Sequence, residues 1–409
     1  MWLYNLGISL YAGGIRLAAL WHGKARLWSE GRRNIFERME AAVRPSDRIV
    51  WVHAASLGEF EQARPIIERL RAEHPEYKIL LTFFSPSGYE IRKNYEGADY
   101  VFYLPADTPP NARRFLDIVH PEIAIFIKYE FWINLLSELR RRKVRSYIVS
   151  AIFRRNSVFF RPYGAMWRQA LETFDTLFVQ NVESKRLLSE IGFDNVVVAG
   201  DTRFDRVAQI AAAAQRVETI ERFRGGGRLF VAGSTWGPDE EILLPLVNAN
   251  PDVKFVIAPH EMDEGRIAHL MRDAKGGAVR YTQCDAATRF DDVQVLVLDT
   301  MGMLSSVYGS ATWAYVGGGF GVGIHNTLEA ATFGLPIAFG PNYGKFKEAR
   351  DMVSLGCAVS VRTAGELAAW FAPLRDDEET LRRASRTAKD YTARNQGATG
   401  IILRSIFNS

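Results

Sequence analysis

The feature that most constrains this chain is an alternation of short apolar runs with helical patterns, which begins near residue 48. The runs are rich in β-branched and aromatic residues and mostly continuous, as is typical of parallel strands covered on both faces. Helical patterns lie between them, for example over Glu59–Glu73 and Phe131–Arg142. The strands predicted in the first half are Arg48–His53, Lys78–Phe84, Asp99–Tyr103, Glu122–Ile127, Arg145–Val149, Asp175–Val179 and Asn195–Ala199. This order predicts a βα series around a parallel sheet.

The alternation breaks once, between Gly200 and Gly227, where a polar turn, an Ala-rich helix and three glycines indicate a linker. The strands predicted after it are Arg228–Ala232, Val253–Ala258, Gln294–Leu298, Thr312–Val316 and Pro336–Phe339. We predict an α/β fold with two Rossmann-like, doubly wound domains facing a cleft, over 31–205 and 228–409. The linker is expected over 206–227, and the last helix is able to pack back on the first domain. Such sheets bind ligands beyond the carboxyl ends of their strands, so the active site is expected in the cleft.

Composition supports a folded chain of two domains. The 409 residues are 47% hydrophobic and 24% charged, which excludes a disordered or fibrous protein. The only cysteines, Cys284 and Cys357, cannot form a disulfide framework or a four-cysteine zinc site, so a reducing compartment is expected. The net charge of +4 is too small for its magnitude alone to indicate nucleic-acid binding, and no nucleic-acid partner is expected.

The N-terminal segment differs from the rest of the chain. Met1–Trp21 is apolar except for Asn5, Ser9 and Arg16. The basic residues that follow it are Lys24, Arg26, Arg32, Arg33 and Arg38. A signal peptide would carry its positive charges before the apolar run, so we expect an uncleaved anchor or interfacial helix over residues 1–30. Spanning and interfacial placements both stay open, and the alternative is a buried first helix of a globular domain.

Glu59 is the first candidate for chemistry. The predicted strand that ends at His53 runs into a turn of small residues, which includes Ser56 and Gly58, and Glu59 then opens a helix. A carboxylate there gains from the helix dipole and could act as a base towards a sugar hydroxyl. The alternative is that acidic residues simply favour first helical turns. His53 itself is expected to be a core residue.

A glycine-rich turn is the second candidate. Tyr315–Ala331 contains five glycines, including Gly318 and Gly319, followed by a predicted helix with Asn326 and Glu329 near its start. Such a turn could bind a phosphate of a sugar nucleotide through its backbone amides, although glycines also serve close packing. The spacing does not match a dinucleotide-binding motif, which disfavours a redox cofactor.

Other polar residues follow predicted strands and would line the same edge of a sheet. In the second half these are Ser234 and Thr235, then Pro259 and His260, then Met301, Gly302 and Met303. In the first half Lys128 and Glu130 follow a strand, unless they form only a solvated edge. His325 and Glu329 are two ligands at most and do not make a metal site, and no Asp-x-Asp pair is present. No metal or other cofactor is expected.

Taken in order, these motifs identify a resemblance that covers nearly the whole chain. The motifs are S-L-G-E at Ser56–Glu59, K-Y-E-F-W at Lys128–Trp132, G-D-T-R-F-D at Gly200–Asp205, D-T-M-G at Asp299–Gly302, H-N-T-L-E at His325–Glu329 and F-G-P-N-Y at Phe339–Tyr343. Together they resemble the bacterial 3-deoxy-D-manno-octulosonic acid (Kdo) transferases. Members of that family transfer Kdo from CMP-Kdo to the lipid A precursor at the inner face of the cytoplasmic membrane.

The resemblance implies an inverting glycosyltransferase of GT-B architecture. It implies an N-terminal acceptor-binding domain and a C-terminal CMP-Kdo-binding domain. Glu59 would be the base that deprotonates the acceptor, and Arg203 would stabilise the departing CMP. The residues that would bind substrates are Ser56, Gly58, Glu130, Ser234, Thr235, Pro259, His260, Met301, Gly302, Met303, Gly318, Gly319, His325, Asn326, Thr327, Leu328 and Glu329. The expected partners are CMP-Kdo, the lipid A precursor and the cytoplasmic membrane surface; the oligomeric state is left undetermined.

The chain departs from the family pattern at three places. Lys128 stands where many members carry an acid, so its catalytic role is undetermined. Pro259-His260-Glu261 lacks an arginine found in the family, and Arg203 replaces a lysine. Two alternatives therefore stay open: another GT-B glycosyltransferase or nucleotide-sugar epimerase, and an inactive membrane-associated binding protein.

Overall fold

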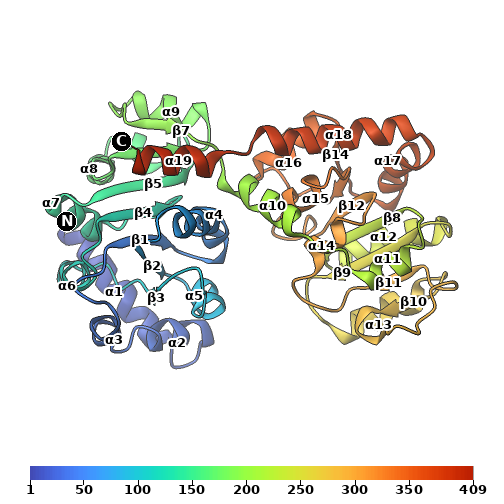
Figure 1. Ribbon diagram of the computed structural model, residues 1–409, viewed down its shortest axis with the longest axis horizontal. Helices are drawn as coiled ribbons and strands as arrows, with labels where there is room; N and C mark the ends of the chain where they lie inside the picture. Colours follow the sequence, from blue (N-terminus) through green and yellow to red (C-terminus); the bar gives the residue numbers. More distant parts are fainter. Residues whose placement is uncertain (409) are drawn as a thin grey trace. The chain divides into compact units, whose positions relative to one another are not determined.

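The chain folds into two compact units, which a computed structural model describes for residues 1–408. Unit 1 comprises Met1–Arg206 and the C-terminal segment that begins at Gln396. Unit 2 comprises Val207–Asn395. Figure 1 labels their helices and strands.

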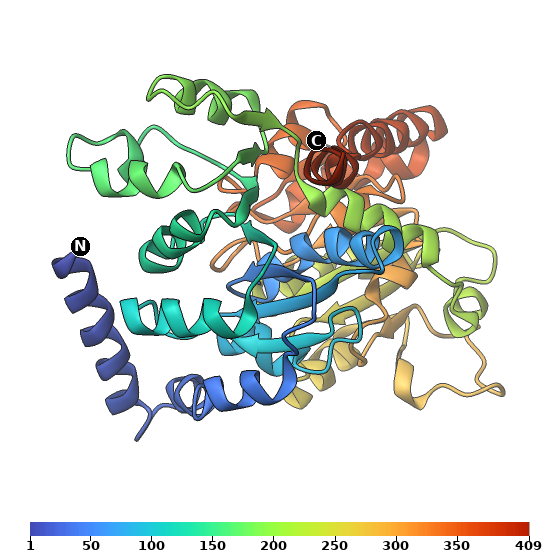
Figure 2. The same ribbon diagram turned by 60° about the vertical axis from the view of Figure 1, so that its left-hand side comes forward.

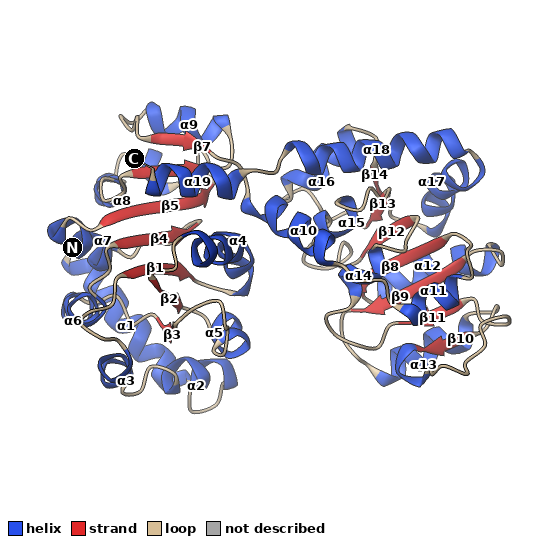
Figure 3. Cartoon of the chain, viewed as in Figure 1, coloured by secondary structure: helices blue, strands red, loops and turns tan. Residues whose placement is uncertain are grey.

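Unit 1 is built on a parallel sheet of seven strands in the order β3-β2-β1-β4-β5-β6-β7. The strands are β1 (Ile49–Ala54), β2 (Lys78–Phe83), β3 (Tyr100–Tyr103), β4 (Ile123–Ile127), β5 (Arg145–Ala151), β6 (Thr176–Val179) and β7 (Val196–Val198). Its helices are α1 (Trp2–Ala18), α2 (Gly23–Glu30), α3 (Ile35–Ala42), α4 (Leu57–Glu73), α5 (Pro86–Arg92), α6 (Pro109–Val119), α7 (Ile133–Arg142), α8 (Ala165–Leu171), α9 (Val182–Ser189) and α19 (Ala398–Phe407). Figure 3 shows helices on both sides of the sheet, which explains the continuous apolar runs.

The core of unit 1 lies on both faces of the central strands. All six residues of β1 are buried, and Trp51 packs edge-to-face on Phe115 and Phe126. The indole N–H of Trp51 donates to the Thr82 hydroxyl at 2.8 Å, so the one polar atom of this side chain is satisfied inside the core. His53 is also buried, against Thr82, which confirms it as a core residue.

The first helix is attached to unit 1 by polar contacts. The Tyr4 hydroxyl donates to Asp107 at 2.6 Å, and the Asn134 amide donates to Asn5 at 2.9 Å. No residue of α1 is fully buried, but the helix belongs to unit 1 and Tyr4 packs against its core, so α1 is a surface helix of this domain and not a buried one. Figure 2 shows α1, in dark blue, at the margin of unit 1. Within residues 1–408, no helix has the length and apolar character needed to cross a membrane.

Unit 2 repeats the architecture with a second parallel sheet of seven strands, in the order β10-β11-β9-β8-β12-β13-β14. The strands are β8 (Leu229–Thr235), β9 (Lys254–Pro259), β10 (Ala278–Arg280), β11 (Val295–Val297), β12 (Trp313–Val316), β13 (Ile337–Phe339) and β14 (Ala358–Ser360). The helices are α10 (Thr202–Ala213), which begins in unit 1, α11 (Glu218–Arg224), α12 (Gly237–Ala249), α13 (Glu264–Asp273), α14 (Leu304–Tyr308), α15 (Leu328–Ala331), α16 (Lys347–Ser354), α17 (Ala364–Asp376) and α18 (Glu378–Arg394). The predicted fold class, two doubly wound α/β domains, is therefore confirmed.

The predicted linker differs from the observed boundary, whereas the last helix lies where the prediction allowed. Residues 206–227, predicted as a linker, form most of α10 and all of α11, and from Val207 onward they cluster with unit 2. The C-terminal helix α19 belongs to unit 1 and contacts α4, in agreement with the expectation that the last helix packs back on the first domain. Asp205 holds the start of this helix, because its carboxylate accepts from the backbone N–H groups of Gly397 at 2.6 Å and Thr399 at 2.7 Å.

Candidate active site

Glu59 lies where the strand order of unit 1 changes direction. It follows β1, and β4 is the neighbour of β1 on the other side of this switch point. Glu59 is the third residue of α4, is half-buried, and its carboxylate accepts a hydrogen bond from the Ser56 hydroxyl. Doubly wound sheets bind ligands at such positions, so the carboxylate is fixed in orientation at the expected place.

Lys128 follows β4, next to the strand that leads to Glu59. Its φ of 62° lies in the left-handed region, which a lysine seldom adopts, so the turn is strained at this position. The neighbouring Tyr129 is about half exposed, and its pKa is raised, first by partial burial. The charges that act on its phenol come from Arg154, Asp201, Glu59 and Arg203, so Tyr129 lies among the polar groups of this site.

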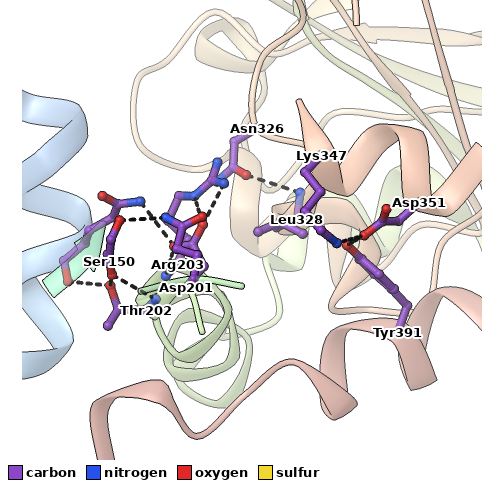
Figure 4. A network of polar contacts seen from close by, with 11 residues as sticks. Ser150, Asp201, Thr202, Arg203, Asn326, Leu328, Lys347, Asp351 and Tyr391 are labelled. Carbon is purple, nitrogen blue, oxygen red and sulfur yellow. Dashed lines mark hydrogen bonds and ion pairs between the residues drawn. The ribbon is translucent and has the colours of Figure 1, made fainter. Parts of the chain in front are cut away.

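Arg203 is held by a neighbouring carboxylate. Its Nε donates to Asp201 Oδ2 at 2.8 Å, and its backbone N–H donates to Oδ1 of the same residue at 2.9 Å (Figure 4). Asp201 is buried and also accepts from Gln62 of α4 at 3.1 Å. The Ser150 and Thr202 hydroxyls lie 3.1 Å apart beside it. The guanidinium is therefore positioned by groups that connect it to the same helix as Glu59.

Glu130 points towards the core. Its Oε2 accepts from the Trp132 indole N–H at 2.8 Å and lies 3.1 Å from His53 Nε2. Both partners are side chains of unit 1, so this carboxylate has a structural explanation in addition to the predicted substrate contact.

In unit 2, three aromatic rings stack at the carboxyl ends of neighbouring strands. Trp236 follows β8, His260 follows β9, and His325 lies in the loop after β12. The ring centroids of Trp236 and His260 are 4.8 Å apart, and those of His260 and His325 are 4.3 Å apart. The Trp236 N–H donates to His325 Nε2 at 3.3 Å. Burial and the neighbouring His260 lower the pKa of His325.

The glycine run beside this stack serves close packing. A Cβ on Gly317 would lie 2.2 Å from the Ser234 carbonyl oxygen, and one on Gly319 would lie 2.6 Å from the Gly340 backbone. The backbone N–H of Gly318 donates to the buried Asp239 carboxylate at 2.9 Å, so this amide is already used inside the protein. The packing explanation therefore accounts for these glycines, and the expected phosphate cradle lacks the Gly318 amide.

The helix expected after the glycine run is a single turn, α15, so its dipole is smaller than a full helix would supply. Asn326 is exposed and donates to Glu329 Oε1 at 3.1 Å, and Ser305 donates to Glu329 Oε2 at 2.8 Å. Thr327 and Leu328 are buried.

The remaining predicted site residues of unit 2 fall into a buried group and an exposed group. Thr235 is fully buried, with its hydroxyl bonded to Glu240 at 2.9 Å, and Pro259 is buried at the end of β9. Met301 is largely exposed in the loop after β11, and Gly302, with a φ of 83°, allows the turn there. Within the part of the chain that the structure describes, no group of three metal-ligating side chains occurs.

The arrangement can be compared with known proteins. Residues 32–206 match the 3-deoxy-D-manno-octulosonic-acid transferase (kdotransferase) family. The Kdo transferase of Bordetella pertussis is 28% identical over 373 residues, which cover 87% of this chain and 86% of that protein. The Kdo transferase of Haemophilus influenzae is 25% identical over 378 residues, covering 88% and 86% respectively.

Solved structures agree on the fold. The UDP-GlcNAc 2-epimerase of Neisseria meningitidis, bound to UDP-GlcNAc, superimposes with a TM-score of 0.62 at 16% identity, over 88% of this chain and all of that one. The two parallel-sheet units therefore have the GT-B fold. The sequence similarity to curated Kdo transferases, which are glycosyltransferases, extends over most of the chain.

Three residues of these sites were not predicted from the sequence: Tyr129, Trp236 and Asp239. Trp236 directly follows the Ser234–Thr235 pair, and Tyr129 directly follows Lys128, so their position after a strand was the available signal. Asp239 lies three residues further into a helix and gave no signal, because only the fold brings it against Gly318.

Proposed function

We propose that this protein transfers Kdo from CMP-Kdo to the lipid A precursor, with Glu59 as the general base. The observation that carries the proposal is the position of Glu59 in a chain similar to the Kdo transferases: it follows the central strand β1, with its carboxylate bonded to Ser56. A single carboxylate suffices for inversion, because the acceptor hydroxyl attacks opposite the leaving phosphate and no covalent sugar intermediate forms.

The base needs an ionised carboxylate that points at the acceptor. The first turn of α4 favours the negative charge through its unpaired N–H groups. The Ser56 hydroxyl restricts the rotation of the side chain. The acceptor hydroxyl gives its proton to Glu59 as its oxygen bonds to the anomeric carbon of Kdo, and the bond from that carbon to the CMP oxygen breaks.

The departing CMP carries negative charge that needs compensation. Arg203 can supply it with a guanidinium whose orientation is set by Asp201. We assign the cytidylate to unit 2, where the imidazoles of His260 and His325 offer stacking surfaces and hydrogen-bonding nitrogens. None of these roles requires a metal ion.

The acceptor is a lipid, so we also propose that the protein works at the cytoplasmic face of the inner membrane. The apolar side chains of α1 support this assignment, because Trp2, Leu3, Leu6, Leu10 and Leu17 are exposed in the folded protein.

Replacing Glu59 tests the proposal. We expect Glu59→Gln to lower kcat by a factor of ~100 or more, since that is the usual contribution of a general base, while CMP-Kdo binding changes less than about twofold. Glu73→Gln, at the other end of the same helix, is the matched control and should keep full activity. The assay is mass analysis of the product from CMP-Kdo and a tetra-acylated glucosamine disaccharide bisphosphate.

Two results would contradict the proposal. Turnover retained by Glu59→Gln would remove this residue from the role of base. Displacement of bound CMP by UDP-GlcNAc at lower concentration than by CMP-Kdo would contradict the donor.

A further inference from the structure

A cavity of about 800 Å³ opens in unit 1 between α1, α2, α3 and the loop after β3. Four arginines line it: Arg16, Arg26, Arg32 and Arg33. Two glutamates also line it, and one of them, Glu37, is paired with Arg114 at 3.3 Å. Within residues 1–408 none of the four arginines forms an ion pair, so the cavity carries an excess of positive charge that the protein does not neutralise.

Arg32 is the most constrained of the four. Its Nε donates to the Leu104 carbonyl at 2.8 Å and its Nη2 to the Phe84 carbonyl at 2.8 Å. Its guanidinium also lies 3.8 Å from the ring centre of Trp28. Burial lowers the pKa of Arg32 to about 9, which shows that the positive charge is poorly solvated at this place. A guanidinium held by carbonyls alone, without a carboxylate, would gain from an added anion.

The position of the cavity relates it to the predicted base. Phe84 and Leu104 directly follow β2 and β3, so Arg32 lies at the carboxyl edge of the sheet, the edge at which Glu59 follows β1. The strands are neighbours in the order β3-β2-β1, and adjacent strands lie ~5 Å apart. The cavity therefore starts roughly 10 Å along this edge from the end of β1.

The lining also includes apolar side chains, and these lead onto α1. Ala12, Ala19 and Leu20 contribute from the N-terminal segment, and Ile35 and Phe36 from α3. The leucines of α1 are exposed beyond the cavity. A ligand that fits this lining has an anionic group and an attached apolar part.

We propose that this cavity binds a phosphate monoester of the acceptor, a phosphorylated glycolipid, whose acyl chains lie along α1. The inference rests on the proposed function and adds a site for the acceptor that is separate from Glu59. Arg33 and Arg26 bind the phosphate from the exposed side, and Arg32 supplies the fixed positive charge behind them.

The test uses the full chain with Arg26→Glu and Arg33→Glu combined, because both side chains are exposed and the fold does not depend on them. The matched control is Arg44→Glu, an exposed arginine before β1 at the opposite edge of the same sheet. We expect the double variant to raise KM for the tetra-acylated disaccharide bisphosphate by ~30-fold or more, since two charge-assisted contacts are lost, with KM for CMP-Kdo unchanged. The control should match the wild type.

Direct binding separates this inference from the proposed function. Detergent-solubilised acceptor is titrated onto the protein without donor, first with both phosphates and then after phosphatase treatment. Selective loss of affinity for the phosphorylated form in the double variant supports the cavity even if no transfer occurs. Equal affinities for both forms in the wild type would overturn the inference. An effect confined to phosphatidylglycerol vesicles would also overturn it, because the ligand would then be a membrane headgroup.

Discussion

The exposed leucines of α1 make a membrane prediction that can be calculated from the structure. Leu3, Leu6, Leu10 and Leu17 recur at intervals of three, four and seven residues, so they share one face of the helix. They are exposed by 66%, 47%, 67% and 60% respectively. Glutamine at all four positions keeps helix propensity and leaves Tyr4 and Asn5, which bind to unit 1, unchanged.

Fully burying a leucine contributes about 1.5–3 kcal/mol, so the exposed fractions leave about 1–2 kcal/mol for each side chain. A helix in the membrane interface buries roughly half of such a face, which gives about 2–4 kcal/mol for the four together. At about 1.4 kcal/mol per factor of ten, the variant should bind vesicles ~30- to 1000-fold more weakly.

The assay is co-sedimentation of the purified chain with vesicles of phosphatidylethanolamine and phosphatidylglycerol. Leu355→Gln is the matched control, because this leucine is 53% exposed in unit 2, far along the chain from α1. Vesicle binding of the quadruple variant within threefold of the wild type would refute the reasoning that α1 is the membrane contact.

Two further predictions concern unit 2. Gly319→Ala should lower the free energy of unfolding by about 1–3 kcal/mol, because its Cβ would overlap the Gly340 backbone. Gly237→Ala is the control: the space around Gly237 is open, so the free energy of unfolding should change by less than about 0.5 kcal/mol. Urea titration measures both values. Because the pKa of His325 is lowered in the folded protein, the unfolded chain binds this proton first, and stability falls as the pH drops below ~6.5. His325→Gln should reduce that loss between pH 7 and pH 5.5, and an unchanged pH profile of the urea midpoint would contradict the assignment.

The central strands of both sheets were predictable because they are apolar and buried on both faces. All twelve predicted strands are present, and the predicted bounds differ from the observed ones by a few residues. The two strands that were missed, β10 and β14, have three residues each and lie at the edges of the unit 2 sheet. They are only partly buried there, so their apolar pattern is weak.

The sites were predictable only in part. Parallel strands place their carboxyl ends together, so the edge that carries Glu59 and the edge that carries His260 followed from strand positions. The stack of Trp236 with His260 and His325 did not follow, because it depends on the strand order β9-β8-β12, which the sequence pattern does not specify. The glycine run allowed both a phosphate cradle and tight packing; the structure shows the packing against Gly340, and phosphate binding stays a prediction.

The placement of α19 has a practical consequence for dividing this protein into fragments. Ile402, Leu403 and Ile406 are part of the hydrophobic core of unit 1, although nearly two hundred residues of unit 2 separate them from the rest of it. A fragment ended at Arg206 would leave that core open to water and the carboxylate of Asp205 without its helix. Expression of unit 1 alone therefore requires its C-terminal residues to be joined to Arg206 through an artificial loop, and a deletion at the C-terminus damages unit 1.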